Sequence, residues 1–247
     1  LNVDGSGTIT SFTVTQTAHP GWPTIRPHRL GIGFYSLNGG KLERTQRFEF
    51  DVDGERTEIA ELVGKARPDL ILLNDDDLAY AKIRLDEHSL KMAIKHLSGI
   101  ADPLARSLVW GAAWDATRDA ETPARDFIDL VLGNIASESE STTVRTVIGQ
   151  LLSAANAYTD PATRSHQRSR VAHELWSLAQ QAEAGSDTQF QLLKAFGQMA
   201  TSEEHLDVIA SLRSGATNLS GLDIDTDLGW ELLIALAAGG RASDADI

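Results

Sequence analysis

The chain has 247 residues, of which 42% are hydrophobic and 23% are charged, and its formal net charge is −13. This apolar fraction is ample for a packed core and excludes a disordered chain, while the length predicts one large or two modest domains. The absence of cysteine excludes a disulfide framework, a cysteine-ligated zinc or iron–sulfur site and a thiol nucleophile.

The acidic charge and the shortness of the apolar segments limit the partners that we expect. Nucleic acids and anionic membranes present phosphate groups that need a basic protein face, so neither is expected as a partner. The longest clearly apolar run, Leu232–Ala238, is far shorter than the roughly 20 residues that a membrane-spanning helix needs. The chain opens on Leu1–Asp4 without an initiator Met or a secretion signal, so we expect a piece cut from a longer, cytoplasmic protein.

The first third of the chain carries patterns typical of short antiparallel strands. Within residues 29–37 the apolar side chains of Leu30, Ile32 and Phe34 alternate with other residues. Asn38-Gly39-Gly40 follows as a hairpin turn, where glycine tolerates positive φ. Further strand patterns cover residues 8–16, 42–52, 57–62, 70–73 and 80–86. These short strands predict an antiparallel β-sandwich domain over residues 1–86.

After Asp86 the pattern changes, and helix starts are marked by a capping residue that is sometimes followed by proline. These starts are Asp102-Pro103, Thr122-Pro123, Ser141 or Thr142, Asp160-Pro161, Ser186 or Asp187, Ser202 and Thr226. About eight helices of roughly 10–20 residues with short connections fit helical hairpins that stack pairwise. Residues 87–247 are therefore predicted to form an all-α, HEAT/armadillo-like superhelix, which makes the chain an α+β multidomain protein.

The segment Asn2–Thr13 begins like a calcium-binding EF-hand loop, with oxygen ligands two residues apart and glycine at the sharp turn. Such a loop needs a bidentate carboxylate at its twelfth position, where this chain has Thr13. It also needs a helix on each side, whereas the residues from Thr8 onward have a strand pattern. A β-turn rich in Asp and Gly is therefore the favoured interpretation.

Two short motifs contain part of a zinc-ligand pattern. His173-Glu174-Leu175-Trp176-Ser177 resembles His-Glu-x-x-His, in which two histidines four residues apart share a helix face and bind zinc. Ser177 stands where the second histidine is needed, and His205, which follows Glu203-Glu204, has no histidine at ligand spacing either. The sequence therefore predicts no metal site.

Three further groups of residues are candidates for a functional role. Arg164–Arg170 (RSHQRSR) is a basic cluster, for which a solvated helix face countering acidic neighbours is favoured over a surface that binds a substrate carboxylate. Asp75-Asp76-Asp77 suggests a cation, but three consecutive residues in a turn rarely converge on one ion. Trp110 and Trp114 share a helix face and are interpreted as core residues. No nucleophile elbow or phosphate loop is present, so we predict no catalytic residue and leave substrate-binding residues unknown.

Two segments carry a more specific resemblance. Arg26–Tyr35 (RPHRLGIGFY) resembles the RPHRLxIGxY strand of bacterial zinc aminopeptidases of the aminopeptidase N family. Pro68–Asp86 (PDLILLNDDDLAYAKIRLD) is similar to the LLLNxDxxxYxKVxxD segment of that family, which closes its β-sandwich domain and leads into its helical domain. The order and spacing of these segments and the change of pattern at Asp86 agree with the resemblance over essentially the whole chain.

The resemblance implies a four-domain enzyme whose third domain is a small β-sandwich and whose fourth domain is a helical bowl. Residues 1–86 are then the sandwich without its first strand, and residues 87–247 are the helical domain truncated at its C-terminus. The family's catalytic parts lie in the second domain: a His-Glu-x-x-His zinc helix, a distal Glu ligand and a Gly-x-Met-Glu-Asn strand. None of these occurs here, so we expect this fragment to be inactive and without a cofactor, with zinc in the parent enzyme's catalytic domain.

Two functions are compatible with these observations. In the first, the chain is the non-catalytic C-terminal part of a zinc-dependent aminopeptidase that removes N-terminal residues from peptides. It then walls and covers the substrate chamber, and its partners are the catalytic domain of the same parent chain and peptide substrates. The alternative is a stand-alone HEAT-like protein-interaction module with a β cap, which binds a partner on its concave face. A zinc helix encoded upstream in the same reading frame would favour the first function.

Overall fold

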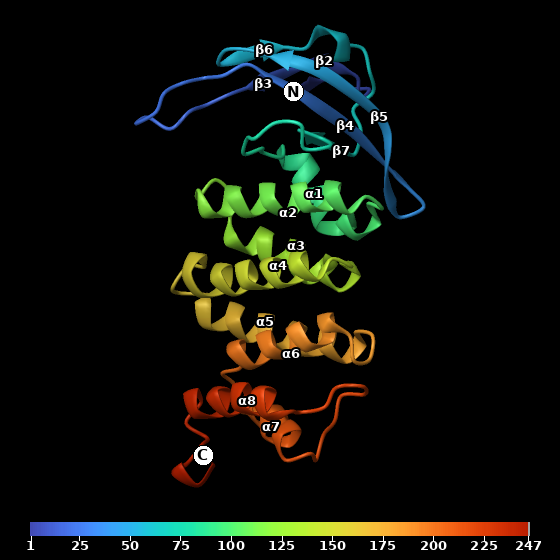
Figure 1. Cartoon of the computed structure of the whole chain (residues 1–247). Helices are drawn as coiled ribbons and strands as arrows, with labels where there is room; N and C mark the ends of the chain where they lie inside the picture. The colour runs from blue at the N-terminus through green and yellow to red at the C-terminus, as the bar shows by residue number, and fades with distance from the viewer. Residues whose placement is uncertain (247) are drawn as a thin grey trace. The chain divides into compact units, whose positions relative to one another are not determined.

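The computed structural model describes residues 1–246, which form seven strands followed by eight α-helices (Figure 1). The predicted order, an antiparallel β region followed by an all-α region, is confirmed. The chain divides into two compact units, Leu1–Asp115 and the described chain from Ala116 onward. The first unit therefore contains α1 (Glu87–His96) and most of α2 (Pro103–Arg118) as well as the strands. The domain border at residue 86 stays a prediction.

The strand pairs of the first unit are antiparallel. The strands are β1 (Asn2–Val3), β2 (Ile9–Ser11), β3 (Thr13–Thr15), β4 (His28–Asn38), β5 (Lys41–Val52), β6 (Arg56–Glu58) and β7 (Leu70–Leu73). β1 pairs with β2, β3 pairs with β6, and a three-stranded sheet has the order β5-β4-β7. The predicted hairpin between β4 and β5 is confirmed, with Gly39 and Gly40 at φ values of 56° and 87°.

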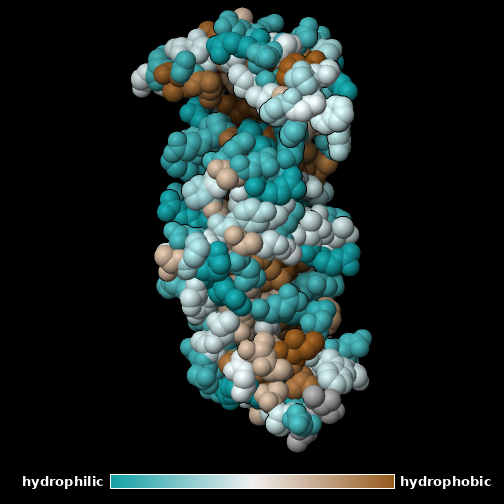
Figure 2. Space-filling model, turned by 90° about the vertical axis from the view of Figure 1, so that its left-hand side faces the viewer, coloured by the Kyte–Doolittle hydropathy of each residue, from teal (hydrophilic) through white to brown (hydrophobic). Residues whose placement is uncertain are grey.

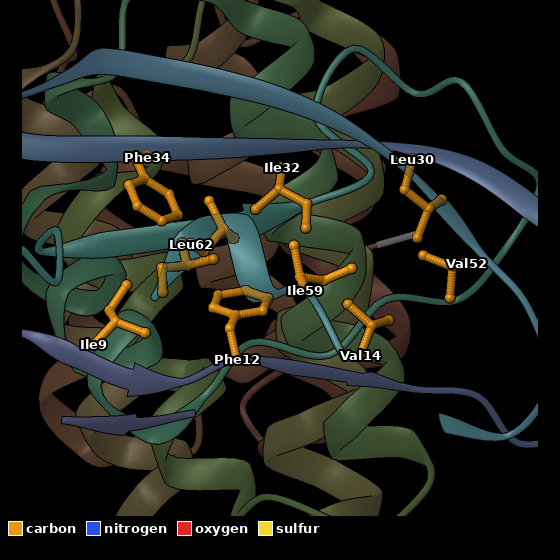
Figure 3. Close-up of a cluster of buried hydrophobic side chains, with 10 residues drawn as sticks. Ile9, Phe12, Val14, Leu30, Ile32, Phe34, Val52, Ile59 and Leu62 are labelled. Atoms are coloured by element: carbon orange, nitrogen blue, oxygen red, sulfur yellow. The ribbon is translucent and has the colours of Figure 1, made fainter. Parts of the chain in front are cut away.

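The hydrophobic core of the first unit lies between two layers of strands. Alternation along β4 buries Leu30, Ile32 and Phe34 on one face of the sheet. Figure 3 shows that this face points toward Phe12 and Val14 of the opposite layer. Ile9, Val52, Ile59, Leu62 and Ile71 complete the cluster. Because burying one such side chain contributes about 1.5–3 kcal/mol, packing between the layers, rather than the short two-stranded pairings, stabilises this unit.

Three of the predicted strands differ from the structure: one is absent, one is divided and one is shorter. Residues 80–86 form no strand. Before them, the Asn74 side chain accepts from the Ala79 N–H at 2.9 Å and donates to the Ala79 carbonyl at 2.7 Å, which closes a turn. The expected strand at residues 8–16 is divided at Phe12 into β2 and β3, which pair with different partners. The expected strand at 57–62 ends at Glu58 and continues as a 3₁₀ turn at Ala60–Leu62.

The second unit consists of stacked helices. They are α3 (Ala124–Asn134), α4 (Ser141–Ser153), α5 (Arg164–Gln181), α6 (Asp187–Met199), α7 (Glu203–Arg213) and α8 (Thr226–Ala238). Helix α3 contacts α4 and α5, α6 contacts α4, α5 and α8, and α7 packs on α8. Contacts between neighbouring and next-neighbouring helices are the arrangement found in helical repeats.

Most helix starts lie where the capping residues predicted them. The side chains of Asp86, Ser186 and Ser202 accept hydrogen bonds from backbone N–H groups at the starts of α1, α6 and α7. Helix α8 is capped by Asp225 instead of Thr226. Helix α5 begins only at Arg164, because Asp160 and the residues after it form a turn. The sequence patterns did not predict the π-helical segment Ala154–Tyr158 that follows α4.

Candidate functional site

The two segments that carry the resemblance meet on one face of β4. Because alternate residues of β4 point into the core, Gly31, Gly33 and Tyr35 lie on the opposite face of the strand. Asp75, which is completely buried, lies against this face, and its N–H donates to the Gly31 carbonyl at 3.0 Å. A Cβ at Gly31 would lie 2.3 Å from the backbone oxygen of Asp75. Glycine in this strand therefore makes room for the turn that follows β7.

Asp75 is the centre of a network of hydrogen bonds and ion pairs formed with Tyr35, Arg44, Arg47 and Asp76, here called the Asp75 network. Tyr35 Oη donates to Asp75 Oδ1 at 2.9 Å, and Arg44 Nη1 donates to Asp75 Oδ2 at 3.0 Å. Arg44 Nη1 also donates to Asp76 Oδ1 at 2.8 Å, and Arg47 Nε lies 2.6 Å from Asp76 Oδ2. Since a buried carboxylate is costly without partners, these contacts are what allow Asp75 to occupy the interior.

The electrostatics of the Asp75 network keep Tyr35, Arg44 and Asp76 in their usual charge states. Burial raises the pKa of Tyr35 well above its ordinary value, and the neighbouring Asp75 carboxylate raises it further. The hydrogen bond from Arg44 lowers the pKa of Asp76. Hydrogen bonds to Asp76 and then Asp75 raise the pKa of Arg44. Tyr35 therefore remains a protonated donor, and the network provides a structural clamp instead of an activated nucleophile.

The three consecutive aspartates do not converge on one point. Asp75 and Asp76 accept from arginines, whereas Asp77 Oδ1 accepts from the Asn74 amide at 3.1 Å. Asn74, Asp76 and Asp77 have φ values of 56°, 70° and 54°, a left-handed conformation that Asn and Asp adopt more readily than most residues. The three carboxylates thus accept from groups of the chain itself and hold a tight turn.

A cleft of about 330 Å³ opens beside the Asp75 network. It is lined by Tyr35, Lys41, Leu42, Glu43, Arg44 and residues 99–102. Its lining combines the buried side chains of Tyr35, Leu42 and Ile100 with cationic and anionic side chains. Because the lining carries charges of both signs, its charge does not identify one class of ligand.

The calcium-like segment at the start of the chain forms a hairpin turn. It connects β1 and β2, so strands and not helices flank it. Asp4 Oδ1 accepts from the Ser6 N–H at 2.8 Å, the Ser6 hydroxyl at 2.6 Å and the Thr8 N–H at 3.0 Å. Gly7 has a φ of 82°. The predicted β-turn is confirmed, because the carboxylate that began the calcium-like pattern is bonded within the turn.

The two histidine motifs come together, which the sequence analysis did not anticipate. The rings of His173 on α5 and His205 on α7 lie with centroids 6.5 Å apart, and Phe196 packs edge-on against His205. His205 is 4% exposed, and its Nδ1 has no hydrogen-bond partner among the described residues. Desolvation, opposed by Glu204, lowers the pKa of His205. Only the stacking of α5 and α7 in space, which no spacing along the chain encodes, could have revealed this pair.

The basic cluster on α5 is partly used inside the second unit. Arg170 Nη2 forms an ion pair with Asp129 Oδ1 of α3 at 2.6 Å. Arg164 Nη2 donates to the Thr159 carbonyl at 3.0 Å. The expectation that this face counters acidic neighbours is supported by the pair with Asp129. In the first unit Trp110 is buried, as predicted for a core residue, while Trp114 is half-buried.

The described part of the chain offers neither a metal site nor a membrane-spanning helix. Residues 1–246 contain no group of three or more His, Cys, Asp or Glu side chains placed to hold a metal ion. None of the described helices has the length and apolar character needed to cross a bilayer. The prominent feature of the described chain is therefore the Asp75 network, which joins the segments carrying the resemblance.

Comparison with known proteins assigns the chain to a family. Residues 70–247 match the ERAP1-like C-terminal domain family. Over 254 aligned residues the whole chain is 44% identical to the aminopeptidase N of Streptomyces lividans. The chain spans only 30% of the length of that relative. The match begins at β7, directly before the turn that carries Asp75, and the predicted resemblance to the aminopeptidase N family is confirmed. The chain belongs to the ERAP1-like C-terminal domain family, found here as the C-terminal region of an aminopeptidase N family protein.

Proposed function

We propose that this chain is the non-catalytic C-terminal part of a zinc-dependent aminopeptidase, where it walls and covers the chamber that admits peptides. The observation that carries the proposal is the 44% identity to Streptomyces lividans aminopeptidase N across the whole of this chain. An alignment that covers 100% of this chain, together with the family match over residues 70–247, supports a shared position in the longer polypeptide.

The zinc of the parent enzyme does not fit the residues of this chain. Residues 1–246 bring no set of three ligand side chains together, and a catalytic zinc site needs three protein ligands and an open position. In our proposal the zinc ligands and the reacting groups therefore belong to the catalytic part of the longer chain. The contribution of this chain is to exclude solvent and to limit which peptides reach that site. A cytoplasmic location stays a prediction.

The proposed wall is testable through substrate size. We would compare the full-length protein with a variant that ends before Leu1, using a single-residue aminoacyl reporter and a peptide of about 15 residues. Without the wall, hydrolysis of the long peptide relative to the reporter should rise, while reporter hydrolysis shows that the catalytic part remains folded. An unchanged ratio in a variant that still cleaves the reporter would contradict the chamber role and favour a separate interaction module.

A further inference from the structure

The turn that follows β7 presents two large apolar side chains to solvent. Tyr80 is 106% exposed relative to its reference state, and Leu78 is 52% exposed. The Tyr80 hydroxyl forms no hydrogen bond with the described residues, whereas the Tyr35 hydroxyl donates to Asp75. Single exposed apolar residues are common, but two of them within three positions on one ordered turn form a distinct surface feature.

The turn is rigidly held in the position from which it presents Tyr80. Asn74 is 1% exposed, and its amide bonds both the N–H and the carbonyl of Ala79, the residue directly before Tyr80. On the other side of Tyr80, the side chain of Ile83 is buried. The backbone that carries Tyr80 is therefore anchored at Ala79 and at Ile83, so that binding a partner there costs little backbone entropy. Tyrosine is among the residue types that most often dominate the binding energy of interfaces.

Three charged residues in the same segment as Tyr80 are bonded or paired within this chain. Asp76 pairs with Arg44, and Asp86 caps α1 and pairs with Arg67. Lys82 lies 3.9 Å from Asp115. The side chains of Tyr80 and Leu78 form no hydrogen bond or ion pair with the described residues. The turn that carries them is nevertheless held by the buried side chains of Asn74 and Asp75. Both side chains are therefore available to bind a partner that is not among the described residues.

We propose that Leu78 and Tyr80 form a docking anchor for the catalytic part of the same longer polypeptide. The inference rests on the proposed function, and the occupant follows from the 70% of the relative's length that the present chain does not cover. The complementary surface on the catalytic part is expected to be an apolar recess with a hydrogen-bond acceptor for the Tyr80 hydroxyl. Such a contact would hold the β region against the catalytic part through two residues that lie shortly before α1.

Site-specific photocrosslinking in the full-length protein tests this anchor. A benzophenone amino acid is placed at position 80 and, as the control, at position 22, because Trp22 is also highly exposed at 82% in the same compact unit. We expect crosslinks from position 80 to lie upstream of Leu1, and Tyr80→Ala to lower the melting temperature of the full-length protein. Tyr80→Ala should leave the melting temperature of the isolated chain unchanged, whereas Tyr80→Phe should lose only part of the effect.

The outcomes separate the anchor from the proposed function. An active, chelator-sensitive full-length aminopeptidase in which position 80 crosslinks only within residues 1–247, or not at all, overturns the anchor and leaves the proposed function standing. Crosslinks from position 80 to a different protein also overturn it. A full-length protein without aminopeptidase activity contradicts the proposed function, and upstream crosslinks from position 80 would then still support a docking surface between the two parts.

Discussion

Gly33 of β4 and Asp75 of the following turn are in such close contact that a Cβ on Gly33 would lie 2.2 Å from Asp75 Oδ2. That separation is far below any normal contact between these atoms. The carboxylate cannot move aside easily, because it is buried and bonded to Tyr35 and Arg44. The glycine and the aspartate therefore depend on each other, and together they join the two segments that carry the family resemblance.

Replacing Gly33 by alanine should destabilise the first unit by about 2–3 kcal/mol, because the added methyl group overpacks a site whose atoms are held on all sides. Chemical denaturation measures this loss. Gly111→Ala in α2 is the matched control: nothing lies within 4 Å of its Cβ position, so it should be neutral or stabilise by up to about 1 kcal/mol. Equal stability of the two variants would show that the turn is not packed as described.

Removing members of the Asp75 network should have unequal costs. Tyr35→Phe deletes one donor to a buried carboxylate and should cost about 1–2 kcal/mol. Asp75→Ala leaves the buried Tyr35 hydroxyl without its partner and should cost about 3 kcal/mol. The double variant should lose less than the sum, because the two residues share one interaction. If the two single losses of stability add up to that of the double variant in denaturation experiments, the network is contradicted. As the control, Asp51→Asn removes one member of an exposed ion pair and should change stability by under about 0.5 kcal/mol.

The stability of the second unit should decrease at acidic pH because of His205. Its pKa is lowered in the folded chain by desolvation, so the folded state binds fewer protons than the unfolded state. The stabilisation is therefore complete above the ordinary histidine pKa of about 6.5 and is lost as the pH falls below it. Denaturation at several pH values between about 8 and 5 should show this decline.

A substitution separates His205 from other acid effects. His205→Gln should flatten the decline in stability below the ordinary histidine pKa, whereas His166→Gln, at an exposed position on α5, controls for the general loss of an imidazole. The same decline in wild type and His205→Gln would assign the acid sensitivity to other groups.

The outer face of α8 should tolerate polar residues. Trp230 and Ile234 are 47% and 62% exposed, while Leu232 is 1% exposed, and Figure 2 shows hydrophobic residues at the surface at the level of this helix. The combined change Trp230→Gln and Ile234→Gln should raise the solubility limit and reduce self-association, measured by sedimentation velocity, with little loss of stability. Leu232→Ala should instead cost about 2–5 kcal/mol. A similar cost for the polar variants would show that another segment covers this face.

The sequence predicted those parts of the fold that depend on local patterns. The alternation of apolar residues in β4 predicted which face of the strand is buried, and Asn38-Gly39-Gly40 predicted the hairpin. Ser186 and Ser202 predicted the starts of α6 and α7. The pattern of the final helix did not show which of its apolar residues are covered: Leu233 and Leu236 are buried, at 5% exposure, whereas Trp230 and Ile234 are exposed.

The features that the sequence did not predict depend on distant residues. Residues 80–86 alternate like a strand but pair with none of the described strands, and alternation of apolar residues does not show whether a pairing partner lies nearby. The role of Gly33 requires knowing that Asp75 packs on it, and the proximity of His173 to His205 requires the stacking of α5 and α7. The motifs identified the right segments, but their chemical roles appeared only when these segments were brought together.

The most direct test of the central claim is to locate the metal and the activity. After extensive dialysis, the zinc content and the hydrolysis of an aminoacyl reporter would be measured for the full-length protein and for the isolated 247-residue chain. We predict stoichiometric zinc and chelator-sensitive hydrolysis in the full-length protein, and neither in the isolated chain. Stoichiometric zinc together with chelator-sensitive cleavage by the isolated chain would contradict its assignment as a non-catalytic part of the enzyme.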